Sequence, residues 1–114
     1  MPNPPLTEAV YYILLSLLEP LHGYGIIQHA EKLSGGQNTE KLSGGRVRLA
    51  AGTLYGAINT LLEKGWIIAL EGEADSRKKE YVITELGREM LQREVRRLWE
   101  LLENGKHLLG GSEQ

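Results

Sequence analysis

The sequence has no cysteine, which excludes disulfide bonds, thiol redox chemistry, cysteine nucleophiles and zinc ribbons. It also lacks a long apolar run: stretches such as Ile13-Leu14-Leu15 fall far short of the roughly 20 residues that a membrane-spanning helix needs. The first residues, Met1 to Pro5, carry no positive charge ahead of an apolar stretch, so they do not resemble a secretory signal. The last two absences predict a cytoplasmic protein with no membrane partner.

A strong positive charge is missing as well. The formal net charge is -2 and the pI is about 5.9, whereas domains that bind nucleic acid are often strongly basic. Binding depends, however, on the local field at the contact face. Between Arg46 and Lys79 the sequence has six basic residues against four acidic ones, which leaves a DNA-binding role open.

The 114 residues, 41% hydrophobic and 25% charged, suit one globular domain. The sequence shows no Ser/His/Asp order, nucleotide-binding glycine pattern or paired carboxylates in an apolar context, so we expect neither an enzyme nor a cofactor. The three histidines, His22, His29 and His107, have neither ligand spacing nor cysteine or acidic partners, and we expect them to be capping or surface residues rather than metal ligands.

Apolar residues recur with helical spacing in four segments. These run from Thr7 to Pro20, from His22 to Gly36, from Gly52 to Gly65 and from Thr84 to residue 109. Thr7 and Thr84 are predicted N-caps, and Gly65 stands where a glycine commonly ends a helix.

Three β-prone runs lie between these helices. They are Arg46–Leu49, Trp66–Leu70 and Tyr81–Ile83, and the last two are typical of a hairpin with a long polar tip. The segment Glu31–Gly36 is repeated as Glu40–Gly45. This unit is too short to build a solenoid and lacks the Gly-Lys-Ser/Thr of a phosphate-binding loop, so it is interpreted as a polar connector.

This order of elements predicts a mainly α fold with a small antiparallel β-wing. We expect a winged helix-turn-helix over residues 1–83, including the connector at 31–45. A C-terminal dimerisation helix would follow over 84–109, and a disordered tail over 110–114.

Several motifs resemble those of the PadR family of transcriptional regulators. They are His22-Gly23-Tyr24-Gly25-Ile26, Gly52-Thr53-Leu54-Tyr55, Leu61 to Ile67, and Arg77 to Thr84 followed by Gly87. The resemblance extends from about Leu6 to about Glu103. Two features depart from the family: Gly56 stands where members often have proline, and the connector is longer. The resemblance implies DNA binding as a homodimer, and in some relatives aromatic residues of the last helix hold flat aromatic compounds between the subunits.

The candidate DNA-binding residues lie on the third helix and the wing. They are Thr53, Tyr55, Asn59, Thr60, Arg77, Lys78 and Lys79. Hydroxyl and amide groups on the outer helix face suit phosphates and base edges, and the basic residues can neutralise phosphates. The alternatives are a solvated helix face, with Tyr55 packed against the wing, and a solvated basic turn.

The last helix carries a stripe at 4-3-4 spacing, formed by Leu91, Val95, Leu98 and Leu102. With its apolar neighbours this stripe is broader than docking on one domain requires, which predicts a second subunit; docking on its own domain is the alternative. Trp99 is the candidate for contact with a small aromatic effector, and a tryptophan packed in the interface is the alternative.

Together these features predict a sequence-specific regulator, an effector-responsive repressor that binds an inverted-repeat operator as a homodimer. The alternative is a winged-helix protein-interaction module without specific DNA binding.

Overall fold

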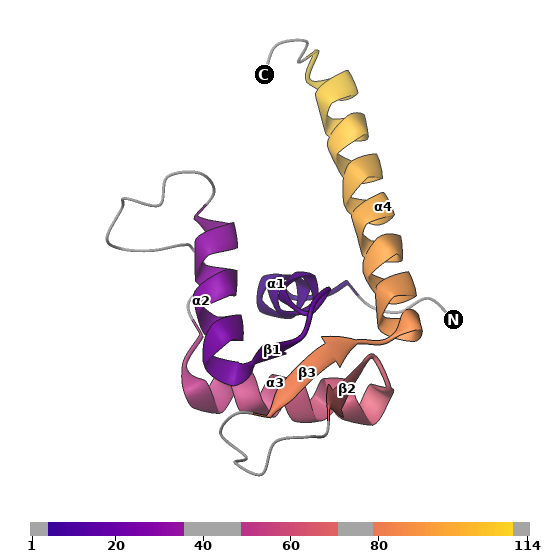
Figure 1. Cartoon of the computed structure of the whole chain (residues 1–114). Coiled ribbons are helices and arrows are strands. Elements are labelled where there is room, and N and C mark those ends of the chain that lie inside the picture. The colour runs from indigo at the N-terminus through magenta and orange to yellow at the C-terminus, as the bar shows by residue number, and fades with distance from the viewer. Residues whose placement is uncertain (1–4, 36–48, 71–78, 111–114) are drawn as a thin grey trace.

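A computed structural model describes residues 5–35, 49–70 and 79–110 of the chain. Its elements in order are α1 (Glu8–Ser16), β1 (Leu21–His22), α2 (Gly23–Ser34), α3 (Ala51–Lys64), β2 (Ile67–Leu70), β3 (Glu80–Ile83) and α4 (Glu85–Leu108). The fold is mostly helical with a small antiparallel sheet, as the sequence predicted (Figure 1). Among the described residues, no helix is both long enough and apolar enough to cross a membrane.

The predicted helix ends are confirmed at three positions. The Thr7 hydroxyl accepts a hydrogen bond from the Val10 N–H (3.1 Å), and the Thr84 hydroxyl accepts one from the Gly87 N–H (3.0 Å). Gly65 ends α3 with a φ of 76°, in the left-handed region that glycine adopts without steric cost. The local sequence therefore sets where α1, α3 and α4 begin or end.

The sheet has the order β1-β3-β2, with β3 in the centre. Tyr81 of β3 lies opposite both Leu21 of β1 and Ala69 of β2. The hairpin of β2 and β3 was predicted, but β1 was not, because two residues are too few to show an alternating pattern.

The strand predicted at Arg46–Leu49 falls mostly outside the described residues, and Leu49 is not in a strand. In the described part of the chain, the third strand of the sheet is β1, which pairs with β3. Most of the duplicated connector and the hairpin tip at 71–78 also lie outside the described residues.

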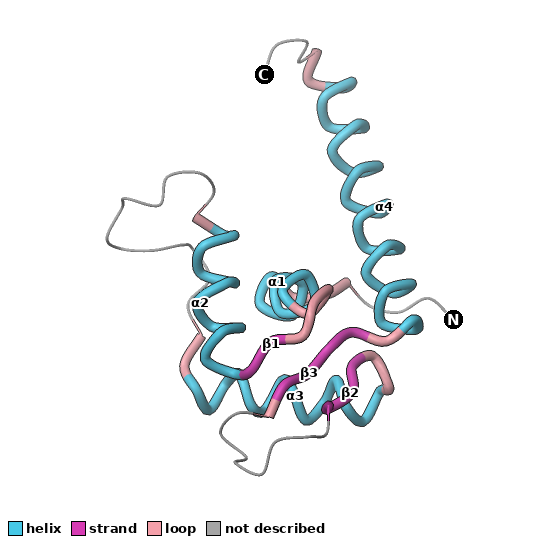
Figure 2. The backbone as a smooth tube through the Cα atoms, viewed as in Figure 1, coloured by secondary structure: helices cyan, strands magenta, loops and turns pink. Residues whose placement is uncertain are grey.

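The core lies where α1, α2, α3 and the sheet meet. Its fully buried side chains are Ile13, Leu14, Leu17, Ile26, Leu54, Ile58 and Ile67. Figure 1 shows α3 along the lower edge of this unit and α4 rising away from it. The tube in Figure 2 shows that the outer half of α4 runs beyond the other elements.

One face of α4 belongs partly to this core. Residues at intervals of three or four share a helix face, and Gly87, Leu91 and Glu94 on that face are all buried. Leu91 is only 4% exposed and packs in the core of its own domain. Of the apolar stripe predicted from the sequence, Leu91 is thus covered by the domain itself, whereas Val95, Leu98 and Leu102 are exposed.

The start of α4 is fixed against the end of α3. The Thr84 N–H donates to the Trp66 carbonyl (2.9 Å), and the Thr84 hydroxyl donates to the Gly65 carbonyl (2.7 Å). A Cβ atom on Gly87 would overlap the Trp66 carbonyl group. The Trp66 carbonyl is backbone that cannot swing aside, so only glycine fits at position 87.

Replacing Gly87 by alanine should therefore destabilise the fold by about 3 kcal/mol, because the new methyl must separate α4 from the Trp66 backbone. Urea denaturation followed by circular dichroism would measure this loss. The control is Gly56→Ala in α3, where a Cβ would meet nothing within 4 Å. There the higher helix propensity of alanine should raise stability by up to about 1 kcal/mol. Equal effects at the two sites would contradict the packing argument.

Candidate nucleic-acid interface

The outer face of α3 is polar and small, as predicted. Leu54, Ile58 and Leu61 are buried on the inner face. The exposed residues on the other side include Gly52, Thr53, Gly56, Asn59, Thr60 and Glu63. The helix thus presents amide and hydroxyl groups, with little bulk around Gly56.

The hydroxyl of Thr60 is already engaged within the helix. It donates a hydrogen bond to the carbonyl oxygen of Gly56, one turn earlier, at 3.2 Å. Such a bond back to residue i−4 is a common arrangement for threonine in a helix. The hydroxyl proton of Thr60 is therefore committed to the backbone.

Tyr55 extends from α3 towards α2 and the sheet. A Cβ on the buried Gly23 would overlap the Tyr55 hydroxyl, so the ring lies directly against the start of α2. Burial raises the pKa of Tyr81 in β3, and the neighbouring Tyr55 hydroxyl raises it further. Tyr55 is nevertheless 44% exposed. Tyr55 therefore packs against α2, whereas the alternative predicted from the sequence was packing against the wing, and part of the side chain is open to solvent.

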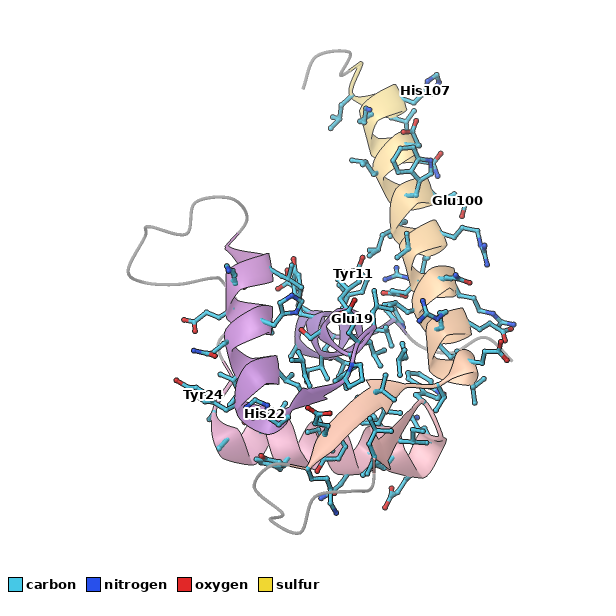
Figure 3. The ribbon with its side chains drawn as sticks, in the orientation of Figure 1. Tyr11, Glu19, His22, Tyr24, Glu100 and His107 are labelled. Carbon is cyan, nitrogen blue, oxygen red and sulfur yellow. The ribbon has the colours of Figure 1, made fainter. Side chains whose placement is uncertain are left out.

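The first turns of α2 and α3 differ from those of α1 and α4. At both α2 and α3 the N-cap residue, His22 or Ala50, makes no side-chain hydrogen bond to the helix. The first amides and the positive end of the helix dipole therefore lack the side-chain cap that a threonine provides elsewhere. Figure 3 shows Tyr24 pointing outward at this end of α2.

Lys79, the one predicted basic wing residue that the structure describes, is exposed just before β3. Arg77 and Lys78 lie outside the described residues, as do Arg46 and Arg48. Glu80, next to Lys79, is also exposed, and its negative charge reduces the local positive potential of Lys79. The described part of the wing thus offers a single cation.

All three histidines lie within the described residues. Within the described ranges there is no cluster of three or more His, Cys, Asp or Glu side chains that could hold a metal ion. His29 instead lies 3.0 Å from the Ser16 hydroxyl, which itself donates to the Tyr12 carbonyl (2.8 Å). The Nδ1–H of His29 therefore donates to Ser16, and the residue helps to join α2 to α1.

A buried carboxylate joins the N-terminal segment to α4. The side chain of Glu94 is 8% exposed, pairs with Arg97 at 2.5 Å and accepts the Leu6 N–H at 3.3 Å. The Arg97 hydrogen bond lowers the pKa of Glu94, burial opposes it, and the Leu6 N–H and the charge of Arg97 lower it further. Glu94 thereby helps to set the direction in which α4 leaves the domain.

Beyond Glu94 the apolar residues of α4 are exposed. The exposed apolar residues there are Val95, Leu98, Trp99, Leu101, Leu102 and Leu108. Glu100 and His107, labelled in Figure 3, mark this half of the helix, which stands clear of the domain. The predicted interface residues Val95, Leu98 and Leu102 thus lie on a surface that continues from the protomer core.

A model of the transcriptional regulator PadR-like family matches residues 13–93, from α1 into α4. The chain belongs to the PadR-like family. This match confirms the resemblance seen in the sequence, and the family is one of transcriptional regulators. It covers the second half of α1, then α2, α3 and the sheet, and the first turns of α4 as far as residue 93.

Solved structures of regulators share this fold. A PadR family transcriptional regulator from Eggerthella lenta is 26% identical, with 91% of this chain and 82% of that one covered and a TM-score of 0.59. RosR from H. salinarum is 25% identical, with 86% and 76% covered and a TM-score of 0.62. BpsR from Bordetella bronchiseptica is 16% identical, with 100% of this chain and 72% of that one covered and a TM-score of 0.67. At this identity the similarity shows only that the two proteins share a fold.

A curated relative extends the sequence comparison. The chain is 35% identical over 89 residues to an uncharacterized 37.1 kDa protein in transposon TN4556 of Streptomyces fradiae. The match covers 77% of this PadR-like chain but only 22% of that protein. The similarity therefore concerns one part of a much longer protein.

The Glu94 junction predicts a specific pH dependence. The pKa of Glu94 is lowered below its ordinary value of 4.5, so the ionised carboxylate stabilises the fold above that pH, and the stabilisation is lost as the pH falls through the folded-state pKa. Glu94→Gln should cost about 1 kcal/mol at neutral pH, since a charged hydrogen-bond acceptor is removed. The difference from wild type should shrink towards zero at low pH, as urea denaturation at several pH values would show.

Glu89→Gln is the matched control. Glu89 also pairs with an arginine on α4, Arg93, but both side chains are 57% exposed, and such pairs contribute little to stability. The prediction is contradicted if the two variants behave alike, or if the effect of Glu94→Gln grows on acidification.

Proposed function

We propose that this PadR-like protein is a cytoplasmic, homodimeric repressor that binds an inverted-repeat operator and is released by a small effector. The observation that carries the proposal is the exposed polar face of α3, at the lower edge of the domain and outside the core (Figure 1). A winged helix-turn-helix inserts such a helix into the major groove.

The reading residues would be Thr53, Asn59 and Thr60. Asparagine can pair with the N6 and N7 edge of adenine, and Asn59 lies on the exposed face of α3. The carboxylate of Glu63, exposed on the same face near the end of α3, repels phosphate. The part of α3 before Glu63, from Thr53 to Thr60, would therefore lie deepest in the groove.

Contacts to the DNA backbone would come from the wing and from the helix starts. Lys79, together with Arg77 and Lys78, would neutralise phosphates beside the groove. The amides at the starts of α2 and α3, which have no side-chain cap, suit phosphate oxygens. Tyr55 would add its exposed edge while its ring holds α3 against α2.

The second subunit would cover the outer half of α4. Val95, Leu98 and Leu102 are exposed there, and Leu102 reaches 53%. The face that they continue is already buried against the domain at Leu91. A second copy of α4 would extend this core across a two-fold axis and hold the two α3 helices at a fixed separation.

The effector would bind beside Trp99. This indole is 62% exposed on the outer half of α4, where a partner helix and a flat aromatic compound could both contact it. Among the proteins of this fold, BpsR is regulated in its DNA binding by 6-hydroxynicotinic acid, a small aromatic acid. That example supports an aromatic effector as the first class to screen.

Operator binding is the direct test. The full chain should bind a pseudo-palindromic duplex with half-sites about one helical turn, or a multiple of it, apart, and should bind a single half-site far more weakly. A mobility-shift titration at modest salt, with the region upstream of the gene against random DNA, would measure this. Equal affinity for both duplexes would favour a protein-interaction module.

Two variants distinguish base recognition by α3 from phosphate contacts by the wing in the same assay. Replacing Lys78 and Lys79 by alanine should weaken binding to all sequences and reduce the salt slope by about one unit for each phosphate that is no longer neutralised. Asn59→Ala should instead weaken operator binding about tenfold or more, because the variant cannot form a bidentate pair with a base. If Asn59→Ala weakened binding to operator and random DNA equally, the reading face would be misassigned.

The dimer is tested on α4. Leu98→Glu would place an unpaired charge in the proposed interface, at a cost of about 3 kcal/mol or more, which weakens a dimer over a hundredfold. Sedimentation at tens of micromolar should show a dimer for the wild type and a monomer for the variant. Ile68→Glu is the control, because Ile68 is 48% exposed on β2, which lies at the other end of the molecule from the outer half of α4 (Figure 1). A monomeric wild type would exclude the dimer.

A further inference from the structure

We infer that Thr60 reads a thymine in each half-site, through contact between its methyl group and the C5 methyl of the base. The inference rests on the proposed operator binding and adds to it a residue that determines base preference. It starts from the hydrogen bond between the Thr60 hydroxyl and the Gly56 carbonyl.

Threonine carries two groups on its Cβ, a hydroxyl and a methyl. In Thr60 the hydroxyl is turned back along α3 and gives its proton to the Gly56 carbonyl, at 3.2 Å. The residue is exposed, so the methyl is the group left to face a ligand. Gly56, one turn earlier, has no side chain, and a Cβ placed there would meet nothing within 4 Å, so the helix surface beside Thr60 is open on that side.

The major-groove edges of the four bases differ in what they offer to such a surface. Guanine presents only acceptors in the major groove and requires a donor, but the donor of Thr60 is occupied. Adenine and cytosine each present an amino group and no methyl. Thymine presents a methyl group, which makes favourable apolar contact with a threonine methyl.

The neighbouring residue favours the same kind of base pair. Asn59 is exposed beside Thr60 on α3, and asparagine suits adenine. Adjacent helix residues point about 100° apart, so the two side chains diverge around the narrow surface at Gly56. They would therefore contact different positions of one A·T-containing step.

Deoxyuridine provides the decisive probe, because it differs from thymidine only by the missing C5 methyl. The operator is first obtained by selecting duplexes from a random pool with the full chain, and each thymidine is then replaced singly by deoxyuridine. At one position, which recurs in both half-sites, the substitution should weaken binding of the wild-type protein about fourfold for each half-site. Substitution in both half-sites should give about sixteenfold, because distant effects add as free energies.

Matched variants test whether the loss of affinity for the deoxyuridine operator depends on the methyl group of Thr60. Thr60→Ser keeps the hydroxyl and removes the methyl, so it should bind the thymidine and deoxyuridine operators equally at that position. Thr60→Val keeps a methyl and removes the hydroxyl, so it should retain the wild-type preference for thymidine. Thr53→Ser removes a methyl from another exposed threonine of α3 and should also retain it.

The opposite results overturn the inference. If Thr60→Ser keeps the fourfold preference for thymidine, another residue contacts the methyl. If Thr60→Val weakens operator binding while Thr60→Ser does not, the hydroxyl accepts from an adenine or cytosine amino group instead. Specific binding with no sensitive thymidine rejects the inference alone, whereas a chain that selects no duplex rejects the proposed function with it.

Discussion

The contact between Gly87 and the Trp66 carbonyl is the constraint on which the arrangement of this protein depends. It brings the first turn of α4 to van der Waals distance from the backbone that links α3 to β2. Thr84 secures the same junction with hydrogen bonds to the Gly65 and Trp66 carbonyls. Because these are backbone contacts, the direction of α4 is tied to the end of the proposed reading helix without an intervening flexible side chain.

Two further contacts extend this constraint through the domain. Glu94 joins the middle of α4 to Leu6, two residues before α1, and Tyr55 joins α3 to the start of α2. If the outer half of α4 were displaced, α3 would therefore move with it as part of the same rigid body. This is the geometry that an effector beside Trp99 would require if it is to alter the separation of two reading helices.

Much of this architecture could be predicted from the sequence because its signals are local. Thr7, Gly65 and Thr84 mark helix ends through the chemistry of single residues, and the periodicity of Leu54, Ile58 and Leu61 defines the inner face of α3. What was missed depends on contacts between distant residues. The strand β1 exists only because β3 lies beside it, and nothing within α4 distinguishes the covered Leu91 from the uncovered Leu98.

The candidate site also has features that the sequence predicted and features that only the structure shows. The composition of the outer α3 face predicted which residues are exposed, but it did not show that the hydroxyls of Thr60 and Tyr55 already have neighbours within the protein. Both facts depend on atomic positions. They change the chemistry that each side chain can offer to a base, although neither changes its place on the helix.

The hydrogen bond between Leu6 and Glu94 also bears on the order of folding. It joins residues 88 positions apart, and closing so long a loop is entropically costly until the intervening chain has become compact. Local structure such as the α1–α2 pair forms early, whereas contacts of this range form late. The outer half of α4 would thus receive its final direction only after the rest of the unit has folded, so that in the proposed dimer the two subunits would pair with their α3 helices already in place.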